Sequence, residues 1–197
     1  MRAWFKKKRV SIDDQLNLLQ SIGIEINRGI ELENCLSFEK RAYEDKPYLL
    51  LLMELGSDAE LEDGKFLPVS DEVRYFDAEC IEGHGDYARV LDKLKALLKA
   101  EIEIDHIKDY VDIEEEEARI FFTVNGNAYT YDLAIHDDWL DKEIIAIFSK
   151  LLMAYGSKKR LYYAEIDQSL LVVSIAKEHF TGLNQLVNVF VPACLEG

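Results

Sequence analysis

The stretch Val73-Arg-Tyr-Phe-Asp-Ala-Glu-Cys-Ile-Glu-Gly-His-Gly-Asp86 joins a strand pattern to the start of the strongest helix pattern in the chain. As a strand, residues 73–81 point their side chains alternately to two faces, so Asp77 and Glu79 project from the same face. The Gly-His-Gly at 83–85 predicts a loop, because glycine adopts backbone angles that other residues avoid. The carboxylate that follows this loop is expected to cap the helix.

The helix after this loop has one continuous apolar stripe. Its apolar residues recur at spacings of three and four, which places them on one side of an α-helix. They are Tyr87, Val90, Leu91, Leu94, Leu97 and Leu98. The sequence therefore predicts strand, loop and helix in succession.

Acidic residues and a histidine gather where the strand pattern gives way to the helix, a position that often carries chemistry in proteins with both elements. Such carboxylates could bind a hard cation, or form an acid–base pair whose pKa values differ. The candidate residues are Asp77, Glu79, Glu82, His84 and Asp86. In the structural alternative, Asp86 caps the helix while Glu82 and His84 face solvent. The other two acids would then pair with Arg74, Lys93 or another base.

Residues 120–131 form the clearest hairpin pattern in the chain. Asn125-Gly126 suits a two-residue type I′ turn, in which both central residues have positive φ. The cross-strand pairs expected from this turn are Val124 with Asn127, Phe122 with Tyr129, Ile120 with Tyr131, and Arg119 with Asp132. One face of the ribbon is then aromatic and has to be covered.

A second polar group, His136, Asp137, Asp138 and Trp139, follows the hairpin and precedes a predicted helix. One of the two aspartates is expected to cap that helix, and Trp139 to pack at its entry. If this segment lies beside the 77–86 loop, its histidine and aspartates join the acidic residues there in one site.

From Glu117 on, the predicted order is strand, strand, helix, strand, strand, helix. This order in the C-terminal half favours an α+β fold, with mainly antiparallel sheets and helices packed on one face. The chain divides into a basic flexible arm (1–10), an N-terminal α+β half (11–103) and a C-terminal α+β half (104–197). A single compact domain is the alternative.

Several shorter patterns complete the N-terminal half and the tail. The predicted elements are a helix that begins at Ser11 and ends at Gly23, a helix over 31–44, a buried strand or short helix over 48–55, a loop over 56–70, a solvated turn at 114–117, a helix over 177–187 and an edge strand within 189–194.

The chain is strongly acidic. Acids number 38 and bases 23, and five of the bases lie in the first ten residues, so the rest of the chain carries 18 bases against all 38 acids. Such a body repels phosphate backbones and anionic lipid, so nucleic-acid or membrane binding by the main surface is not expected. A basic protein partner is favoured. The hydrophobic fraction of 49% is enough for a proper core.

Cysteine usage and apolar runs bear on the compartment. Cys35, Cys80 and Cys194 are odd in number and far apart, which predicts free thiols in a reducing cytosol. No apolar run approaches the ~20 residues that span a bilayer, and no secretory signal is expected at the N-terminus. The basic run at residues 6–9 matches a nuclear-localisation or nucleic-acid-binding patch. The alternative is a flexible arm, or an arm that folds back onto the acidic body.

Motifs of nucleotide-binding loops, nucleophile elbows and paired metal ligands do not occur, so no cofactor and no metal is expected. Cys80 shares the predicted strand face of Phe76 and Ala78, which indicates a buried, inert thiol.

The segments Phe76–Tyr87 and Asp137–Trp139, with the apolar run that begins at Pro47-Tyr48, resemble a set of bacterial cytosolic proteins of unassigned role. In size and acidity the chain is also similar to the immunity proteins that neutralise polymorphic toxins. This likeness of character implies a binding role, and it assigns no site residues.

We therefore expect an acidic cytoplasmic binding protein, in its most specific form an immunity-type inhibitor that masks a basic protein surface such as a toxin's nucleic-acid cleft. The alternative is an enzyme, a metal-assisted hydrolase built on the 77–86 loop. A third hypothesis is nucleic-acid binding through the arm. The oligomeric state stays open.

Overall fold

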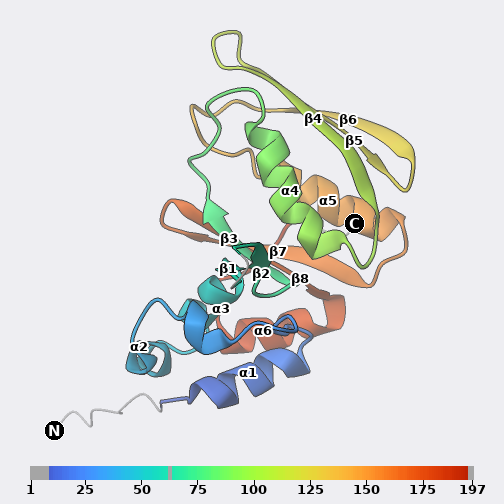
Figure 1. Ribbon diagram of the computed structural model, residues 1–197. Coiled ribbons are helices and arrows are strands. Elements are labelled where there is room, and N and C mark those ends of the chain that lie inside the picture. The colour runs from blue at the N-terminus through green and yellow to red at the C-terminus, as the bar shows by residue number, and fades with distance from the viewer. Residues whose placement is uncertain (1–8, 62–63, 195–197) are drawn as a thin grey trace, which may run out of the picture.

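The computed structural model describes residues 9–61 and 64–194, and within them it has six α-helices and nine strands in three antiparallel sheets (Figure 1). The predicted α+β class with antiparallel sheets is confirmed. Most of the predicted basic arm, residues 1–8, lies outside the described residues. Of its two described members, Arg9 forms a salt bridge with Asp45 at 2.7 Å.

The elements, with η for a 3-10 helix, are α1 (Ile12–Ser21), η1 (Leu32–Cys35), α2 (Lys40–Asp45), α3 (Leu49–Leu55), β1 (Asp58–Glu60), β2 (Phe66–Pro68), β3 (Val73–Asp77), α4 (Asp86–Leu98), β4 (Ile104–Asp112), β5 (Glu117–Val124), β6 (Asn127–Leu133), α5 (Glu143–Ala154), β7 (Lys159–Ile166), β8 (Ser169–Ala176), η2 (Lys177–His179), α6 (Phe180–Leu186) and β9 (Val191–Pro192).

A four-stranded sheet of order β3-β8-β7-β9 lies at the centre of the fold. Strand β3 pairs antiparallel with β8, so that Val73 lies opposite Val173 and Asp77 opposite Ser169. Over Val73–Asp77 the predicted alternation is confirmed, because Val73 packs into one hydrophobic core and Phe76 into the other. The strand does not extend to Ile81 as predicted, and Ile81 packs in the core of Phe76 rather than in that of Val73. Each core contains residues from both predicted halves of the chain, 11–103 and 104–197.

Helices cover both faces of this central sheet. In Figure 1, α4 and α5 lie above it, and α1, α2, α3 and α6 lie below it. Residues of α4 and α5 share one core with Leu161 and Val172, while residues of α1, α3 and α6 share the other core with Tyr162 and Leu171. The central sheet therefore separates two hydrophobic cores and contributes side chains to each of them.

The second large sheet has the order β4-β5-β6 and carries its helices on one face, as predicted. Its β5–β6 hairpin has the predicted register, including Phe122 opposite Tyr129. Both turn residues have positive φ, 48° for Asn125 and 80° for Gly126. Helix α5 covers the aromatic face, where the rings of Phe148 and Phe122 lie 5.1 Å apart between centroids. The hairpin prediction is confirmed in detail.

Strand β4 has no counterpart among the predicted elements. Its register with β5 shifts between Asp105 and Lys108, and His106 between them has a φ of 55°. This bulge interrupts the alternation of apolar and polar residues from which a strand is predicted. Residues 114–116 of the acidic run form the turn between β4 and β5, and Glu117 begins β5, so the predicted solvated turn is confirmed for the first three glutamates.

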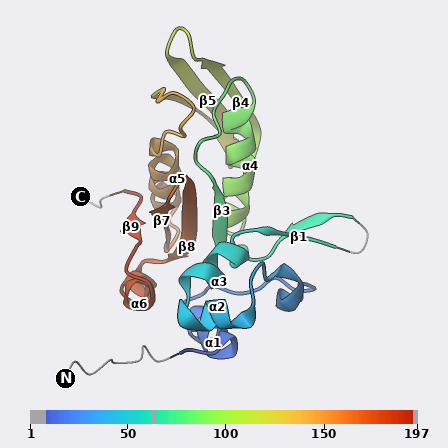
Figure 2. The ribbon, with the colours of Figure 1, turned by 90° about the vertical axis from the view of Figure 1, so that its left-hand side faces the viewer.

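The region between α1 and β3 differs most from the predictions. The single helix predicted over 31–44 is wrong, since η1 and α2 are separate short helices there. Residues 49–55 take the helical alternative as α3. The predicted 56–70 loop contains the hairpin β1–β2, which forms a sheet of its own and stands out from the body in Figure 2.

The last predicted elements agree with the structure. η2 and α6 together occupy residues 177–186, and β9 is the edge strand beside β7. Of the helices in the described part of the chain, none combines the length and apolarity that a bilayer crossing requires.

Candidate functional site

The structure brings together the two segments that the sequence singles out, and adds the β7–β8 turn as a third. The backbone amide of Ala78 donates to the carbonyl of Gln168 at 2.8 Å. The amide of Leu140 donates to the carbonyl of Ala78 at 2.7 Å, and the amide of Ile81 to the carbonyl of Asp138 at 2.9 Å. The loop after β3, the segment before α5 and the β7–β8 turn therefore lie side by side.

We call this surface the three-loop face. It consists of Asp77, Glu79, Glu82, Asp137, Asp138, Trp139 and Asp167. Glu79 and Trp139 form an isolated antiparallel bridge at its centre.

Short-range hydrogen bonds shape the loops of the face. Asp77 ends β3 and accepts a hydrogen bond from the backbone amide of Glu79 at 3.0 Å. The amide of Trp139 donates to the carbonyl of His136 at 3.0 Å, closing a turn in which Asp137 has a φ of 53°. Aspartate tolerates this left-handed conformation better than most residues. The loops thus hold their carboxylates outward on a backbone that is itself hydrogen-bonded.

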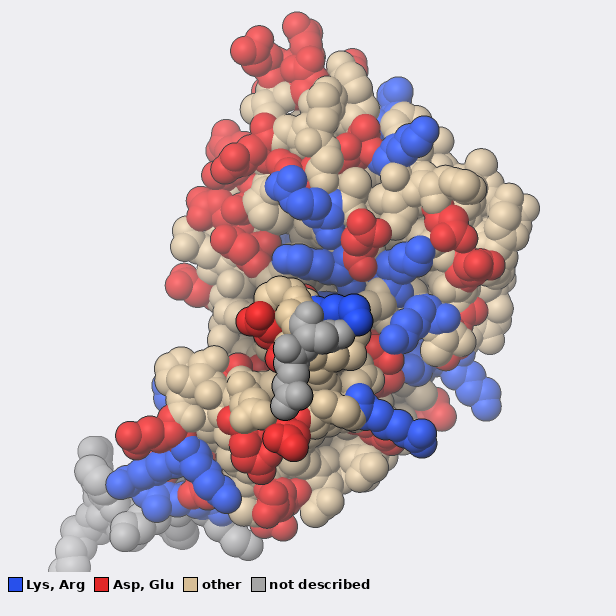
Figure 3. Space-filling view, in the orientation of Figure 1, with Lys and Arg blue, Asp and Glu red and all other residues tan. Residues whose placement is uncertain are grey.

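The carboxylates of the face have no salt-bridge partner in the part of the chain that the structure describes. Those of Asp77, Glu82, Asp137 and Asp167 belong to exposed residues, and those of Glu79 and Asp138 to half-buried ones. None of the six forms a salt bridge with any Lys, Arg or His in the described ranges. Figure 3 shows acidic side chains gathered along the edge of the molecule where the loop after β3 and the β7–β8 turn lie. Among the described residues, the face is therefore a concentration of carboxylates that are not engaged in salt bridges.

Trp139 lies on the same face, beside Glu79, with 38% of its surface exposed. It borders a pocket of about 300 Å³. The pocket is lined by Ala78, His136, Trp139, Leu140, Lys142, Glu165, Asp167, Ser169 and Leu170. Lys142 donates to Glu165 at 2.8 Å, and this hydrogen bond raises the pKa of the lysine. The lysine stays protonated, and its positive charge is paired with the carboxylate of Glu165.

Asp86 of the predicted cluster turns away from the three-loop face. It is 5% exposed, and its Oδ2 accepts hydrogen bonds from the backbone amides of Glu82 at 2.7 Å and Gly83 at 2.9 Å. Its other oxygen forms a salt bridge with Arg89. This carboxylate fixes the loop from inside. The expectation that Asp86 caps the helix is wrong, because α4 begins at Asp86 itself, its N-cap is Gly85, and the carboxylate accepts loop amides rather than helix amides.

His84 lies at the opposite end of the same loop, against β4. Its Nδ1 accepts a hydrogen bond from the backbone amide of Val111 at 2.8 Å, and its ring lies 5.1 Å from that of Tyr110. A hydrolytic site built on the 77–86 loop would need the imidazole of His84 beside the carboxylate of Glu79. In the structure this imidazole instead contacts Val111 and Tyr110 of β4.

The helix caps come from residues that the sequence pattern did not indicate. Asp109 on β4 accepts hydrogen bonds from the amides of Gly85 and Ala88 at the start of α4. At α5 the expected cap by Asp137 or Asp138 is wrong, because Asp141 accepts the amide of Glu143 at 2.9 Å. No local sequence signal indicates the role of Asp109, because it lies on β4 and not next to α4 in the sequence. Asp141 could have been predicted from its position two residues before the start of α5.

The thiol of this region is not activated. Cys80 is half-buried, and burial together with the nearby charge of Asp77 raises its pKa, so the thiol stays protonated at neutral pH. Within residues 9–61 and 64–194, no three His, Cys, Asp or Glu side chains are grouped so that they could hold a metal ion.

Comparisons of this chain with protein-family models, with curated proteins and with solved structures find no match. The geometry of the three-loop face is thus the basis for a functional proposal. Carboxylates that form no salt bridge among the described residues, on the same face as an exposed tryptophan, suit contact with a positively charged protein surface.

Proposed function

We propose that this chain is an acidic binding protein whose three-loop face docks onto a basic surface of a protein partner. The observation that carries the proposal is Trp139, which is exposed beside a pocket and shares the three-loop face with six carboxylates that form no salt bridge among the described residues. Tryptophan is enriched among the residues that dominate binding energy at protein interfaces. Clustered charge of one sign speeds encounter with a partner of the other sign.

The two features have separate roles in this proposal. Ion pairs at an exposed rim contribute about 0–1 kcal/mol each, so the carboxylates mainly set the association rate and its dependence on salt. The affinity comes from Trp139 and from an apolar partner side chain that enters the pocket, whose apolar lining includes Ala78, Leu140 and Leu170. Water is excluded there, and burial of apolar surface stabilises the complex.

In its more specific form, the proposal is that the partner is a toxin and that this chain is an immunity-type inhibitor, which covers the toxin's nucleic-acid cleft. A cleft that binds phosphate backbones is dense in lysine and arginine, which is the chemical complement of the three-loop face. The cytoplasm is the compartment we propose, supported by three cysteines that are free in the structure.

The test uses the basic proteins encoded beside the gene for this chain, each purified and titrated against it. Trp139→Ala is expected to weaken binding at least about tenfold, as loss of an interface hot spot does. Phe38→Ala is the matched control, because Phe38 is also an exposed aromatic residue, at 56%, and lies between η1 and α2. It should bind as the wild type does.

A second variant removes charge from the face without removing side-chain volume. It carries Asp77→Asn, Glu79→Gln, Asp137→Asn and Asp138→Asn. Association should slow and become less sensitive to salt, while the variant with Gln at positions 114–117, which loses the same charge from the β4–β5 turn, should associate normally. The proposal fails if no neighbouring basic protein binds, or if the control variants lose binding and the face variants keep it.

A further inference from the structure

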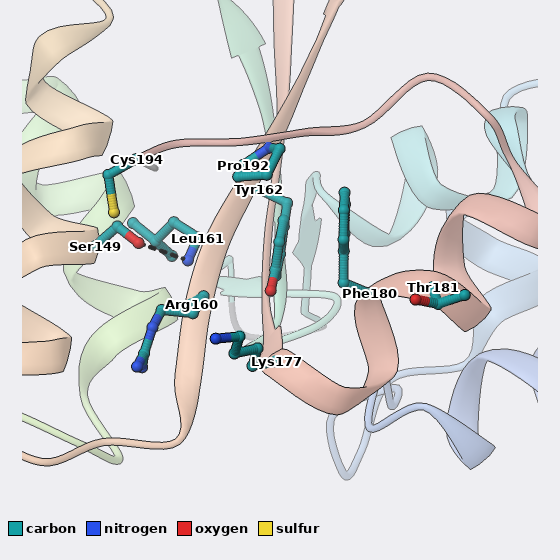
Figure 4. A pocket seen from close by; sticks show the side chains of 9 residues that line it. All are labelled: Ser149, Arg160, Leu161, Tyr162, Lys177, Phe180, Thr181, Pro192 and Cys194. Carbon is teal, nitrogen blue, oxygen red and sulfur yellow. Dashed lines mark hydrogen bonds between the residues drawn. The ribbon is translucent and has the colours of Figure 1, made fainter. Parts of the chain in front are cut away.

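Two further pockets, both outside the three-loop face, differ in the charged residues that line them. The first, of about 310 Å³, lies between α5, β7, α6 and β9, and its lining includes Arg160 and Lys177 (Figure 4). The second, of about 570 Å³, lies between the segment around η1, the end of α3 and strand β1. Its lining includes the carboxylates of Glu31, Glu54, Asp58 and Glu60. The second pocket, which we call the acidic groove, is therefore the one that suits a positively charged ligand.

The four carboxylates of the acidic groove form no salt bridge in the part of the chain that the structure describes. Glu54 is 8% exposed, and the hydroxyl of Tyr43 and the amide and hydroxyl of Ser37 donate hydrogen bonds to it at 2.6 Å, 3.1 Å and 3.1 Å. The other three carboxylates belong to exposed residues. A cation that enters the groove thus meets three exposed carboxylates, and the buried one adds a fixed negative charge.

Strand β1 turns backbone groups toward the groove. Among the described strands β1 pairs with β2 alone, and beyond its end the amide of Leu61 donates to the carbonyl of Lys65 at 2.7 Å. Opposed residues of an antiparallel pair alternate between hydrogen-bonded and non-bonded, so Ala59 is bonded to β2 as Leu61 is to its own partner. Asp58 and Glu60 therefore direct their amides and carbonyls away from β2.

These backbone groups of Asp58 and Glu60 have no hydrogen-bond partner within residues 9–61 and 64–194. All three residues of β1 line the acidic groove, and no residue of β2 does so. The hairpin stands out from the body, as Figure 2 shows. A free strand edge is a template on which another extended chain can pair. The free edge of β1 thus forms one wall of an open groove that is rich in carboxylates.

We infer that the acidic groove binds an extended basic segment of a partner protein, which adds to the free edge of β1 as a third strand. Main-chain hydrogen bonds to Asp58 and Glu60 hold such a segment, and its alternate side chains give specificity. The groove shares no residue with the three-loop face, so this contact is separate from the docking proposed above.

The geometry of the hairpin specifies the pattern of the segment. The side chains of Asp58 and Glu60 lie on one face of the hairpin, and those of Ala59 and its partner Leu67 lie on the other. Directly opposed side chains of neighbouring strands contact each other. The residues opposite the two acids should therefore be lysine or arginine, and the residue between them should be apolar.

The experiment adds the peptide acetyl-Lys-Val-Lys-Val-Lys-amide to the full chain and follows amide hydrogen exchange in β1 by nuclear magnetic resonance. In the free protein the amides of Asp58 and Glu60 should exchange faster than that of Ala59, which is bonded within the hairpin. At saturation the peptide should slow exchange at Asp58 and Glu60 at least about tenfold, because both amides gain a partner.

A second peptide, acetyl-Lys-Lys-Lys-Val-Val-amide, has the same composition and charge without the alternation. It should bind at least about fivefold more weakly, since it cannot place a lysine opposite each acid and valine between them. Equal binding of the two peptides would mean that the groove attracts positive charge without pairing a strand, and would overturn the inference.

Glu31→Gln combined with Glu60→Gln removes two exposed charges from the groove and keeps the side-chain volume. The affinity for the alternating peptide should fall about fivefold, as the loss of two exposed ion pairs predicts. Asp58 is left in place, because its charge also acts on the buried guanidinium of Arg74.

The matched control for this variant is Glu33→Gln combined with Glu39→Gln. It removes the same charge from two exposed residues, one in η1 and one directly before α2, that do not line the groove. The affinity should stay within about twofold of the wild type. Equal losses in the two double variants would contradict the assignment of the groove.

Glu60→Pro tests the main-chain contact, because proline lacks the amide that would bond the segment and this amide does not bond β2. Glu60→Ala is its control, since it loses the same carboxylate and keeps the amide. The proline variant should bind the alternating peptide at least about fivefold more weakly than the alanine variant. Slow exchange of the Ala59 amide in both variants reports an intact hairpin.

Two further results would overturn the inference. They are unchanged exchange at Asp58 and Glu60 when the peptide binds, and equal binding by the proline and alanine variants. Deletion of residues 1–8 should leave the affinity unchanged. A gain of about tenfold or more would assign the groove to the basic N-terminus of this chain in place of a partner segment.

Discussion

Asp109 on β4 holds the N-terminus of α4 through Gly85, whose backbone amide donates to Oδ1 at 2.8 Å and to Oδ2 at 3.0 Å. The amide of Ala88 donates to the same carboxylate at 3.1 Å. Helix N-termini leave several amides without intrahelical partners, and here a neighbouring strand supplies the acceptor. The contact fastens the loop that carries Glu79 and Glu82 to the rest of the fold.

Asp109→Ala should lower the free energy of unfolding by about 1–2 kcal/mol, the usual cost of losing a cap that also complements the helix dipole. Urea denaturation measures it. Asp92→Ala is the control, since Asp92 is an exposed carboxylate within α4, and it should change stability by less than about 0.5 kcal/mol. Equal effects of the two substitutions would contradict the capping role.

Tyr43→Phe should destabilise the protein by about 1–3 kcal/mol, because it removes a donor from a buried carboxylate. The Tyr43 hydroxyl donates to Glu54 at 2.6 Å, and Glu54 is 8% exposed. Burial and this hydrogen bond raise the pKa of Tyr43, so the phenol stays protonated and able to donate. Thermal and urea unfolding both measure the loss.

The control for this substitution is Tyr75→Phe. Tyr75 is half-buried, and no hydrogen bond of its hydroxyl occurs within the described residues. The change should therefore cost less than about 0.5 kcal/mol. A Tyr43→Phe protein as stable as the Tyr75→Phe protein would show that Glu54 does not depend on the phenol.

Stability should fall in alkaline solution through the ionisation of Tyr87. Burial raises the pKa of this phenol from 10.0 to about 12. Above about pH 10 the unfolded chain loses the phenol proton while the folded protein keeps it. The free energy of unfolding therefore falls as the pH rises towards about 12. The contribution is fully present below pH 10 and is of the order of 2 kcal/mol.

Urea midpoints measured across this pH range for wild type and Tyr87→Phe test the effect. Phenylalanine cannot ionise, so the variant should lose less stability between neutral and alkaline pH than the wild type does. The variant also loses the acceptor of the Asp141 amide, which lowers its stability at every pH and leaves the difference in slope as the measurement. Parallel curves would contradict the prediction.

Gly56→Ala should destabilise the protein by about 1–3 kcal/mol or more, as overpacking does. A Cβ at this position would lie 2.5 Å from the backbone nitrogen of Tyr75, and the carbonyl of Gly56 accepts that same amide at 2.9 Å. Helix α3 and strand β3 can approach this closely because the residue between them has no side chain.

Gly83→Ala is the matched glycine substitution. Nothing lies within 4 Å of its added Cβ, and its backbone is outside the left-handed region. Its unfolding free energy should stay near that of the wild type or rise slightly, because alanine restricts the unfolded chain. If Gly56→Ala also leaves the unfolding free energy near that of the wild type, the packing of α3 against β3 has room for a Cβ and the prediction is contradicted.

Short-range patterns were sufficient for the elements whose structure depends on neighbouring residues. The hairpin turned by Asn125-Gly126 has its predicted register, and α1 begins at the predicted cap, where Ser11 accepts the amide of Asp14 at 3.1 Å. The acidic loop after β3 and the His136–Trp139 segment were also recognisable as polar clusters. Each of these features is encoded within about ten residues of sequence.

The sequence by itself therefore determined the α+β class, the acidic surface, the strand and helix on either side of the Gly-His-Gly loop, and most of the residues of the three-loop face. Tertiary structure alone decided that β3 pairs with β8, that Asp109 caps α4, that Glu79 lies beside Trp139, and that Arg160 and Lys177 line one pocket. The physical reason is that turns, caps and amphipathic stripes depend on local backbone geometry. Contacts between distant segments depend on how two cores pack against the faces of one shared sheet, which no local pattern contains.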